Sequence, residues 1–322
     1  MEMLSRVEQE MCDPDSDDAE PDLSERLDGL DLDESPEKVW ERLSEKEKNE
    51  FENLLKAGKL NTLVEIWTPW WTVKNDSLVT DLEQESKQFE GRPRCLGTIP
   101  DIRQLLKNSK PSADVKYNMV NVLYSYAFIA RLHNGEHVTF CLDSSKELSQ
   151  ISDVLGKNVV CSSAPEAIQL CLLALTKGEH LQSSQDLRLS TVQSVIDIIQ
   201  GPDTNHSLDY IMAALSDSLS ILQNSRKIIS RGIKKTTLSK QNGSDQQQFK
   251  KKLFQMEKKV EFLLSWTQRF GMVMQTLIPE IKLEQCVVLD DEEEVKATKE
   301  KFEKKWGGKV QPPKKKLIEE IT

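Results

Sequence analysis

The residues best suited to chemistry stand at positions 133–137, in the order His-Asn-Gly-Glu-His. Two histidines and a glutamate in this H-x-x-E-H order match an inverted zinc-hydrolase pattern, in which the histidines hold the metal and the glutamate acts as a general base. The chemistry requires one helix that presents both histidines on the same face. Asn134-Gly135, however, is a strong turn former. We interpret the stretch as a polar turn and assign no metal ligand there.

Other catalytic groups are sparse. The six cysteines form no C-x-x-C pair and fit no zinc spacing, which predicts reduced and mostly buried thiols. No phosphate-binding loop, dinucleotide fingerprint or nucleophile elbow occurs, and four histidines leave little general-base capacity near neutral pH. We therefore expect a protein that is not an enzyme, with no catalytic residue and no cofactor.

Large aromatic side chains offer a different chemistry, the recognition of a partner. The stretch Ile-Trp-Thr-Pro-Trp-Trp at 66–71 holds three of the six tryptophans. We expect Trp67 in the core, because it lies at helical spacing from Leu63. Pro69 breaks the helix, and Trp70 and Trp71 are adjacent, so they point to different sides. At least one should be exposed as an anchor, and we predict Pro69, Trp70 and Trp71 as partner-binding residues.

A basic segment is the remaining candidate site. Residues 226–240 contain six Lys and Arg residues and no acid, and residues 250–259 add more. Such a face could meet RNA phosphates, but it lacks the aromatic platforms of single-strand binding sites. We interpret it as a solvated helix face. Direct RNA binding through the basic helices around 226–259 is kept as the alternative function.

The elements that must position these residues are helical. Apolar residues recur with helical spacing over 101–108, 117–132, 165–176, 190–199, 208–229 and 249–277. The only strand candidates are the short stretches 137–142 and 158–161. These patterns predict an all-α protein of stacked antiparallel helices, an irregular helical array with no fixed repeat.

The array is flanked by a disordered acidic N-terminal arm and an extended C-terminal tail. The first fifty residues carry a net charge of -13, whereas the whole chain carries -10. Acid-rich sequence without aromatic residues predicts disorder, and helix starts at Ser35-Pro36-Glu37 and Ser44-x-x-Glu47 follow it. The expected divisions are a disordered acidic arm (1–35), a helical hairpin with a Trp-rich tip (36–71), a linker (72–94), a helical body with a polar linker near 239–248 (95–306) and an extended tail (307–322).

Several stretches together resemble one family. They are SPEKVWERLSEKEKNEFENLLKAGKLNTLVEIWTPWW, FLLSWT at 262–267 and the ending WGGKVQPPKKKLIEE. Over residues 36–322 the chain resembles the zinc finger HIT domain-containing proteins. Members of that family begin with a HIT-type zinc finger, for which this chain has no matching cysteine pairs. Either this is a form that lacks the finger, or the segment that carries it is missing from this sequence. Metal binding is not carried over.

The resemblance implies a non-enzymatic adaptor or assembly factor. Its expected partners are the RuvB-like AAA+ ATPases, the Hsp90-linked prefoldin-like co-chaperone complex and proteins of small nuclear (spliceosomal) or nucleolar ribonucleoproteins. The expected location is the cytoplasm and nucleus, with no membrane association, because the longest apolar run, about six residues, is far short of a membrane span. Besides Pro69, Trp70 and Trp71, we predict Trp306, Gly307 and Gly308 as partner contacts.

Overall fold

The computed structural model describes residues 23–27, 36–56, 66–73, 91–107, 109–177, 184–235 and 240–306. The chain divides into two compact units, residues 1–66 and 67–322. The described residues are overwhelmingly helical and include no strand, which confirms the all-α class. In the part of the chain so described, each helix is too short or too polar to cross a bilayer.

Unit 1 contains three short helices, α2 (Leu23–Leu27), α3 (Pro36–Arg42) and α4 (Glu45–Lys56). The predicted capping box at the start of α4 is present: the Ser44 amide donates to Glu47 Oε2 at 2.7 Å, and the Glu47 amide donates to Ser44 Oγ at 3.3 Å. The Trp40 and Phe51 rings meet edge-on at 5.6 Å. Local capping and this aromatic pair therefore define the α3–α4 hairpin.

The prediction of a disordered arm over 1–35 is wrong for residues 23–27, which form α2. Arg26 holds this helix to the hairpin: its guanidinium lies 2.5 Å from Glu47 Oε1 and donates to the Arg42 carbonyl at 3.2 Å. A cation within the acidic sequence thus gives the segment a partner. The rest of the predicted arm lies outside the described residues.

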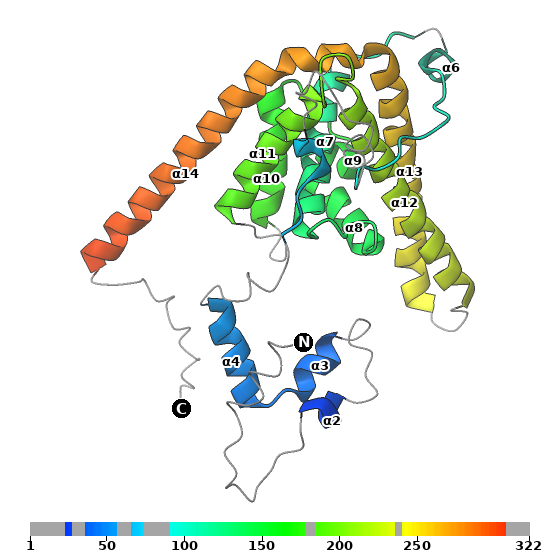
Figure 1. Ribbon diagram of the computed structural model, residues 1–322. Coiled ribbons are helices and arrows are strands. Elements are labelled where there is room, and N and C mark those ends of the chain that lie inside the picture. The colour runs from blue at the N-terminus through cyan, green and yellow to red at the C-terminus, as the bar shows by residue number, and fades with distance from the viewer. Residues whose placement is uncertain are drawn as a thin grey trace, which may run out of the picture. The chain divides into compact units, whose positions relative to one another are not determined.

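Unit 2 is built around α7 (Val115–Leu132), which lies at its centre (Figure 1). Most α7 side chains from Met119 to Ala130 are fully buried, as expected of a helix that is apolar on all sides. Surrounding it are α8 (Cys141–Ile151), α9 (Asp153–Lys157), α10 (Ala164–Lys177), α11 (Gln185–Gln200) and α12 (Asp209–Lys235). The core of unit 2 is therefore helix packed on helix.

A buried asparagine fastens three of these helices together. Asn121 Nδ2 of α7 donates to the Ala167 carbonyl of α10 at 2.9 Å, and Ser152 Oγ, at the start of α9, donates to Asn121 Oδ1 at 2.6 Å. Because both polar ends of the amide are satisfied, its burial costs little and fixes the relative position of the helices.

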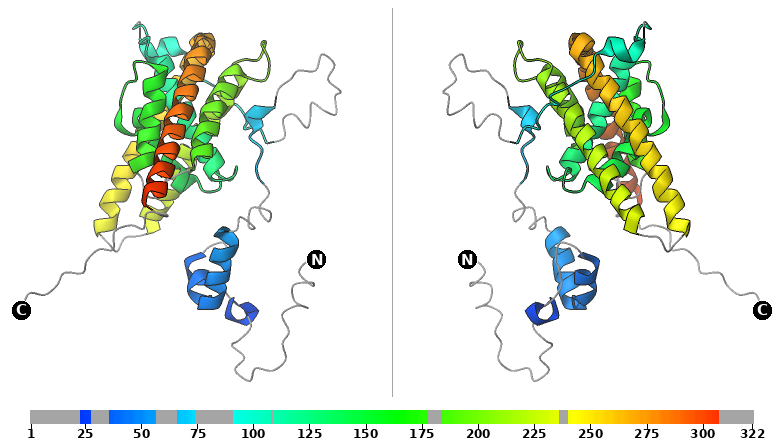
Figure 2. Two further views of the ribbon diagram at one scale, coloured as in Figure 1. Left: turned by 90° about the vertical axis from the view of Figure 1, so that its left-hand side faces the viewer. Right: turned by 90° about the vertical axis from the view of Figure 1, so that its right-hand side faces the viewer.

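The remaining helices form the outer part of unit 2. The α12 helix pairs side by side with α13 (Lys240–Phe270) over most of its length (Figures 1 and 2). A short 3₁₀ segment, η4 (Gly271–Leu277), then leads into α14 (Ile278–Trp306), which crosses α10 and α11. Pro279 lies in the first turn of α14, where a missing N–H is tolerated.

Three local predictions are wrong. Residues 137–140 form a turn ahead of α8, and Asn158, with φ 62°, closes α9, so neither strand candidate is a strand. The expected linker near 239–248 is helical from Lys240 onward, because local propensity, including the turn preference of Asn242-Gly243, is weak and the packing of α13 on α12 overrides it. The tip of the expected 36–71 hairpin is also misplaced, because Trp67 begins unit 2.

Two shorter elements complete unit 2. The 3₁₀ turn η2 (Trp70–Thr72) carries the adjacent tryptophans, and α6 (Ile102–Leu106) follows the extended residues 91–100. Residues 91–100 run along α12: Arg92 lies 2.9 Å from Asp209 Oδ2, and the Leu96 amide donates to Ser216 Oγ at 3.0 Å. Residues 74–90 of the predicted 72–94 linker and the predicted tail at 307–322 lie outside the described residues.

Candidate interaction surface

The tryptophans of residues 66–71 form an aromatic cluster. Trp71 meets Trp67 and Trp70 edge-on, with ring centroids 5.4 and 5.1 Å apart. Trp70 also packs on Tyr210 of α12 at 5.2 Å, and Trp71 on Tyr126 of α7 at 5.9 Å. Edge-to-face packing of this kind adds to the stability gained from burial alone. The cluster therefore fixes residues 67–72 to the helical body.

The expectation that Trp70 or Trp71 is exposed is wrong. Trp71 is fully buried, Trp70 is 6% exposed and Pro69 is buried as well. The two indoles do point in different directions, but each direction is filled, one by Tyr210 and the other by Tyr126. These side chains present no surface to a partner in this fold. Trp67 packs against the core, which confirms its expected structural role.

The turn at 133–137 lies beneath this cluster. Asn134 and Gly135 adopt φ of 47° and 90°, and the Trp67 amide donates to Asn134 Oδ1 at 2.9 Å. The interpretation of the H-x-x-E-H stretch as a polar turn is therefore confirmed.

The two histidines of the turn bind different carboxylates. His133 Nε2 lies 2.7 Å from Glu147 of α8, and His137 Nε2 lies 2.7 Å from Asp217 of α12. Nowhere in the described ranges do three or more His, Cys, Asp or Glu side chains gather as metal ligands would. The two histidines of the H-x-x-E-H pattern therefore contact carboxylates on two different helices.

His137, Asp217 and Tyr126 form a buried polar network. Asp217 Oδ2 also accepts the Tyr126 hydroxyl at 2.8 Å, and all three side chains are less than a tenth exposed. Burial, followed by the neighbouring Asp217 carboxylate, raises the pKa of Tyr126 well above its ordinary value. The network lies against the Trp67 and Trp71 rings, so its contacts serve to anchor the turn to α12.

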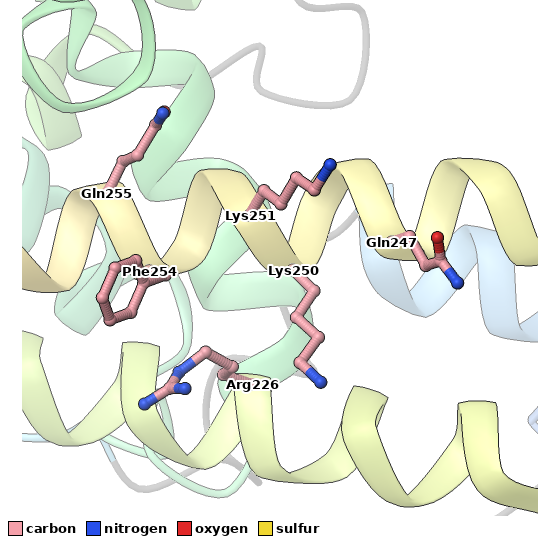
Figure 3. A pocket seen from close by; sticks show the side chains of 6 residues that line it. All are labelled: Arg226, Gln247, Lys250, Lys251, Phe254 and Gln255. Atoms are coloured by element: carbon pink, nitrogen blue, oxygen red, sulfur yellow. The ribbon is translucent and has the colours of Figure 1, made fainter.

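An open groove lies where α13 faces α12. Its volume is about 640 Å³, and it is lined by Arg226, Gln247, Lys250, Lys251, Phe254 and Gln255. Figure 3 shows Lys250 and Phe254 directed from α13 toward Arg226 of α12, with Lys251 and Gln255 on the other side of α13. Phe254 is 47% exposed. We call this feature the α12–α13 groove.

The charge around the groove is strongly positive. Residues 226–252 include nine Lys or Arg residues and a single acid, Asp245. Arg226 is held 2.5 Å from the buried carboxylate of Glu257, and its guanidinium lies 5.5 Å from the Phe254 ring centre. The sequence analysis missed Phe254. The available signal was its spacing of four residues from Lys250, which places both on one helix face.

A second exposed feature runs along α14. Its inner face carries the buried residues Ile281, Glu284 and Val288, and Glu284 accepts from Gln169 of α10 at 2.6 Å. Leu283 and Val287, one turn apart on the opposite face, are 68% and 42% exposed. We call Leu283 and Val287, with the exposed Cys286 next to them, the α14 outer stripe.

The predicted contacts at the C-terminal end are only partly described. Trp306 is the last residue of α14, at the end of the range 95–306 that was predicted for the helical body. Gly307 and Gly308 lie outside the described residues.

No family model and no solved structure matches the chain. The all-α class therefore stands on the fold itself, and the resemblance to the zinc finger HIT domain-containing proteins stays a prediction.

Proposed function

We propose that this chain is a non-enzymatic adaptor of the zinc finger HIT type. It would link RuvB-like AAA+ ATPases and Hsp90-associated prefoldin-like co-chaperones to the assembly of small nuclear or nucleolar ribonucleoproteins. The family resemblance supplies the identity of these partners. The fold supports the class of function, because helical bodies with exposed faces commonly act as binding modules.

The α14 outer stripe is the observation that supports the adaptor proposal most. Leu283 and Val287 place two large apolar side chains side by side on a helix whose opposite face is already packed on the body. A row of exposed apolar side chains rimmed by polar ones is typical of protein interfaces. With Trp70 and Trp71 buried, this stripe replaces them as our candidate for the ATPase contact.

Direct RNA binding is the second candidate, and the α12–α13 groove is the surface on which it would take place. The groove combines lysines with an exposed aromatic ring, which the sequence analysis had not found in the basic segment. Phosphate contacts release counterions and weaken steeply with salt, whereas an apolar contact does not. The two candidates therefore differ in a measurable property.

The test is co-elution of the purified full chain with purified RuvB-like ATPases, and separately with a small nuclear RNA, across a salt series. The adaptor proposal predicts a complex with the ATPases that persists from low to moderate salt. A chain that binds only the RNA, with steep loss of affinity as salt rises, would support the second candidate and contradict the first.

A further inference from the structure

We propose that the α12–α13 groove binds an acidic peptide segment of a partner protein, one with a large apolar side chain among its carboxylates. This surface is separate from the α14 outer stripe. The inference goes beyond the proposed function and does not depend on the identity of the ATPase.

The charge of the groove selects for acidic ligands. Most of the residues that line the groove belong to the segment 226–252, with nine basic residues and one acid, although the whole chain carries a net charge of -10. Lys250 and Lys251 pair with no carboxylate among the described residues. Lys250, directed toward α12, and Lys251, on the other side of α13, would each attract carboxylates and speed their association.

The groove is also apolar enough to hold a side chain. Phe254 leaves nearly half of its surface uncovered on the side of α13 that faces Arg226 of α12. Covering an aromatic ring of this kind with an apolar side chain gives an interface its central contact, while the surrounding charges form the rim. A volume of about 640 Å³ is ample for one large side chain.

The groove is held in place before any ligand arrives. Arg226 is tied to Glu257, which is 2% exposed, and Lys258 is paired with Glu261 at 2.6 Å. Both cations lie 5.5 Å from the Phe254 ring centre. Less conformational freedom is therefore lost when a peptide binds.

The same contacts favour a peptide over RNA. Single-strand sites stack successive bases on several aromatic rings, whereas this groove offers one ring, with two cations already beside it. The side-chain amides of Gln247 and Gln255 at its edge can donate to and accept from a peptide backbone. An acidic peptide with one apolar residue uses all of these groups.

The test is fluorescence anisotropy with the full chain and three labelled probes of equal length. One is a peptide of glutamates around a central tryptophan, the second has glutamine in place of every glutamate, and the third is a single-stranded oligouridylate. We expect the glutamate peptide to bind most tightly. Lys250→Glu/Lys251→Glu should weaken it by about tenfold or more, because two attractive charges become repulsive toward the carboxylates.

Two further variants separate the groove from general electrostatics. Phe254→Ala should weaken the glutamate peptide while leaving every lysine in place, and Lys282→Glu, an exposed change on α14, should leave binding unchanged. Helical content by circular dichroism confirms that each variant is folded. Equal binding of the glutamate and glutamine peptides, tighter binding of the oligouridylate, or equal losses in Lys282→Glu and the groove variant would each overturn the proposal.

Discussion

Gly135 lies directly against the indole ring of Trp67. A Cβ built on this glycine would stand 2.7 Å from Trp67 Cδ1, far inside van der Waals contact, and its φ is 90°. Two conditions thus require glycine here: the backbone conformation and the close approach of the ring. The relationship joins the tryptophan segment to the turn that follows α7.

Replacement of Gly135 should therefore destabilise unit 2 through both conditions. We expect Gly135→Ala to lower the free energy of unfolding by about 2–4 kcal/mol, the sum of backbone strain and ring displacement. Gly91→Ala is the matched control, because Gly91 has φ 87° but nothing within 4 Å of the added Cβ. Urea unfolding followed by circular dichroism measures both. Equal losses for the two variants would mean that the Trp67 contact does not constrain the turn.

The buried tryptophan Trp71 should contribute to stability rather than to binding alone. Trp71→Ala removes a fully buried indole that contacts Trp67, Trp70 and Tyr126, and should cost about 3–5 kcal/mol. Ile66→Ala, at a side chain that is 78% exposed, should change stability by less than about 0.5 kcal/mol. A Trp71→Ala protein as stable as the wild type would place this tryptophan outside the core.

The sequence predicted the class of fold but not the role of these tryptophans. Helical periodicity and caps identified α3, α4, α7 and α10 within a few residues, because those signals are local, whereas one or both ends of α11, α12 and α13 were missed by more. Whether Trp70 and Trp71 are buried depends on Tyr210 and Tyr126, which come from helices far along the chain. Local sequence carries no record of such contacts.

For the candidate surfaces, too, the sequence predicts the local features but not the contacts between helices. The positive charge of 226–252 could be counted directly, yet the groove exists only because α12 and α13 pair and leave Phe254 partly uncovered. The α14 outer stripe likewise required knowledge of which face of α14 packs on α10 and α11. Leu283 and Val287 would have been taken for core residues by spacing alone.

His206 should titrate above its ordinary range. The Asp203 carboxylate accepts a hydrogen bond from His206 Nδ1 at 2.9 Å, which raises the pKa of His206, and the negative charge of Asp203 adds to the effect. Because the pKa of His206 is raised in the folded state, the small stabilisation is fully present at pH values below the pKa of the unfolded state. It is lost as the pH rises through the pKa of the folded state. NMR titration should show the shift, and Asp203→Asn should remove most of it. An unchanged pKa in Asp203→Asn would contradict the assignment.

The cysteines should differ sharply in reactivity. Cys95 and Cys286 are exposed, whereas Cys141, Cys161 and Cys171 are buried. Burial raises the pKa of Cys161 to about 11 and that of Cys171 further still, so little thiolate forms at neutral pH.

Iodoacetamide labelling followed by peptide mass spectrometry measures this difference. Among these five, Cys95 and Cys286 should be labelled in the native protein, and the other three only after denaturation. Rapid native labelling of Cys171 would show that the contact between α7 and α10 is open in solution.

The central claim is that the α14 outer stripe binds the RuvB-like ATPases. The most direct measurement is the affinity of the full chain for RuvB-like ATPases by biolayer interferometry, for the wild type and Leu283→Asp/Val287→Asp. Leu173→Asp is the matched control, because Leu173 is a half-exposed leucine on another helix. We predict binding by the wild type and the control, and a loss of about 2 kcal/mol or more in the stripe variant, as for a central interface contact. No binding by the wild type, or equal binding by all three folded proteins, would contradict the account.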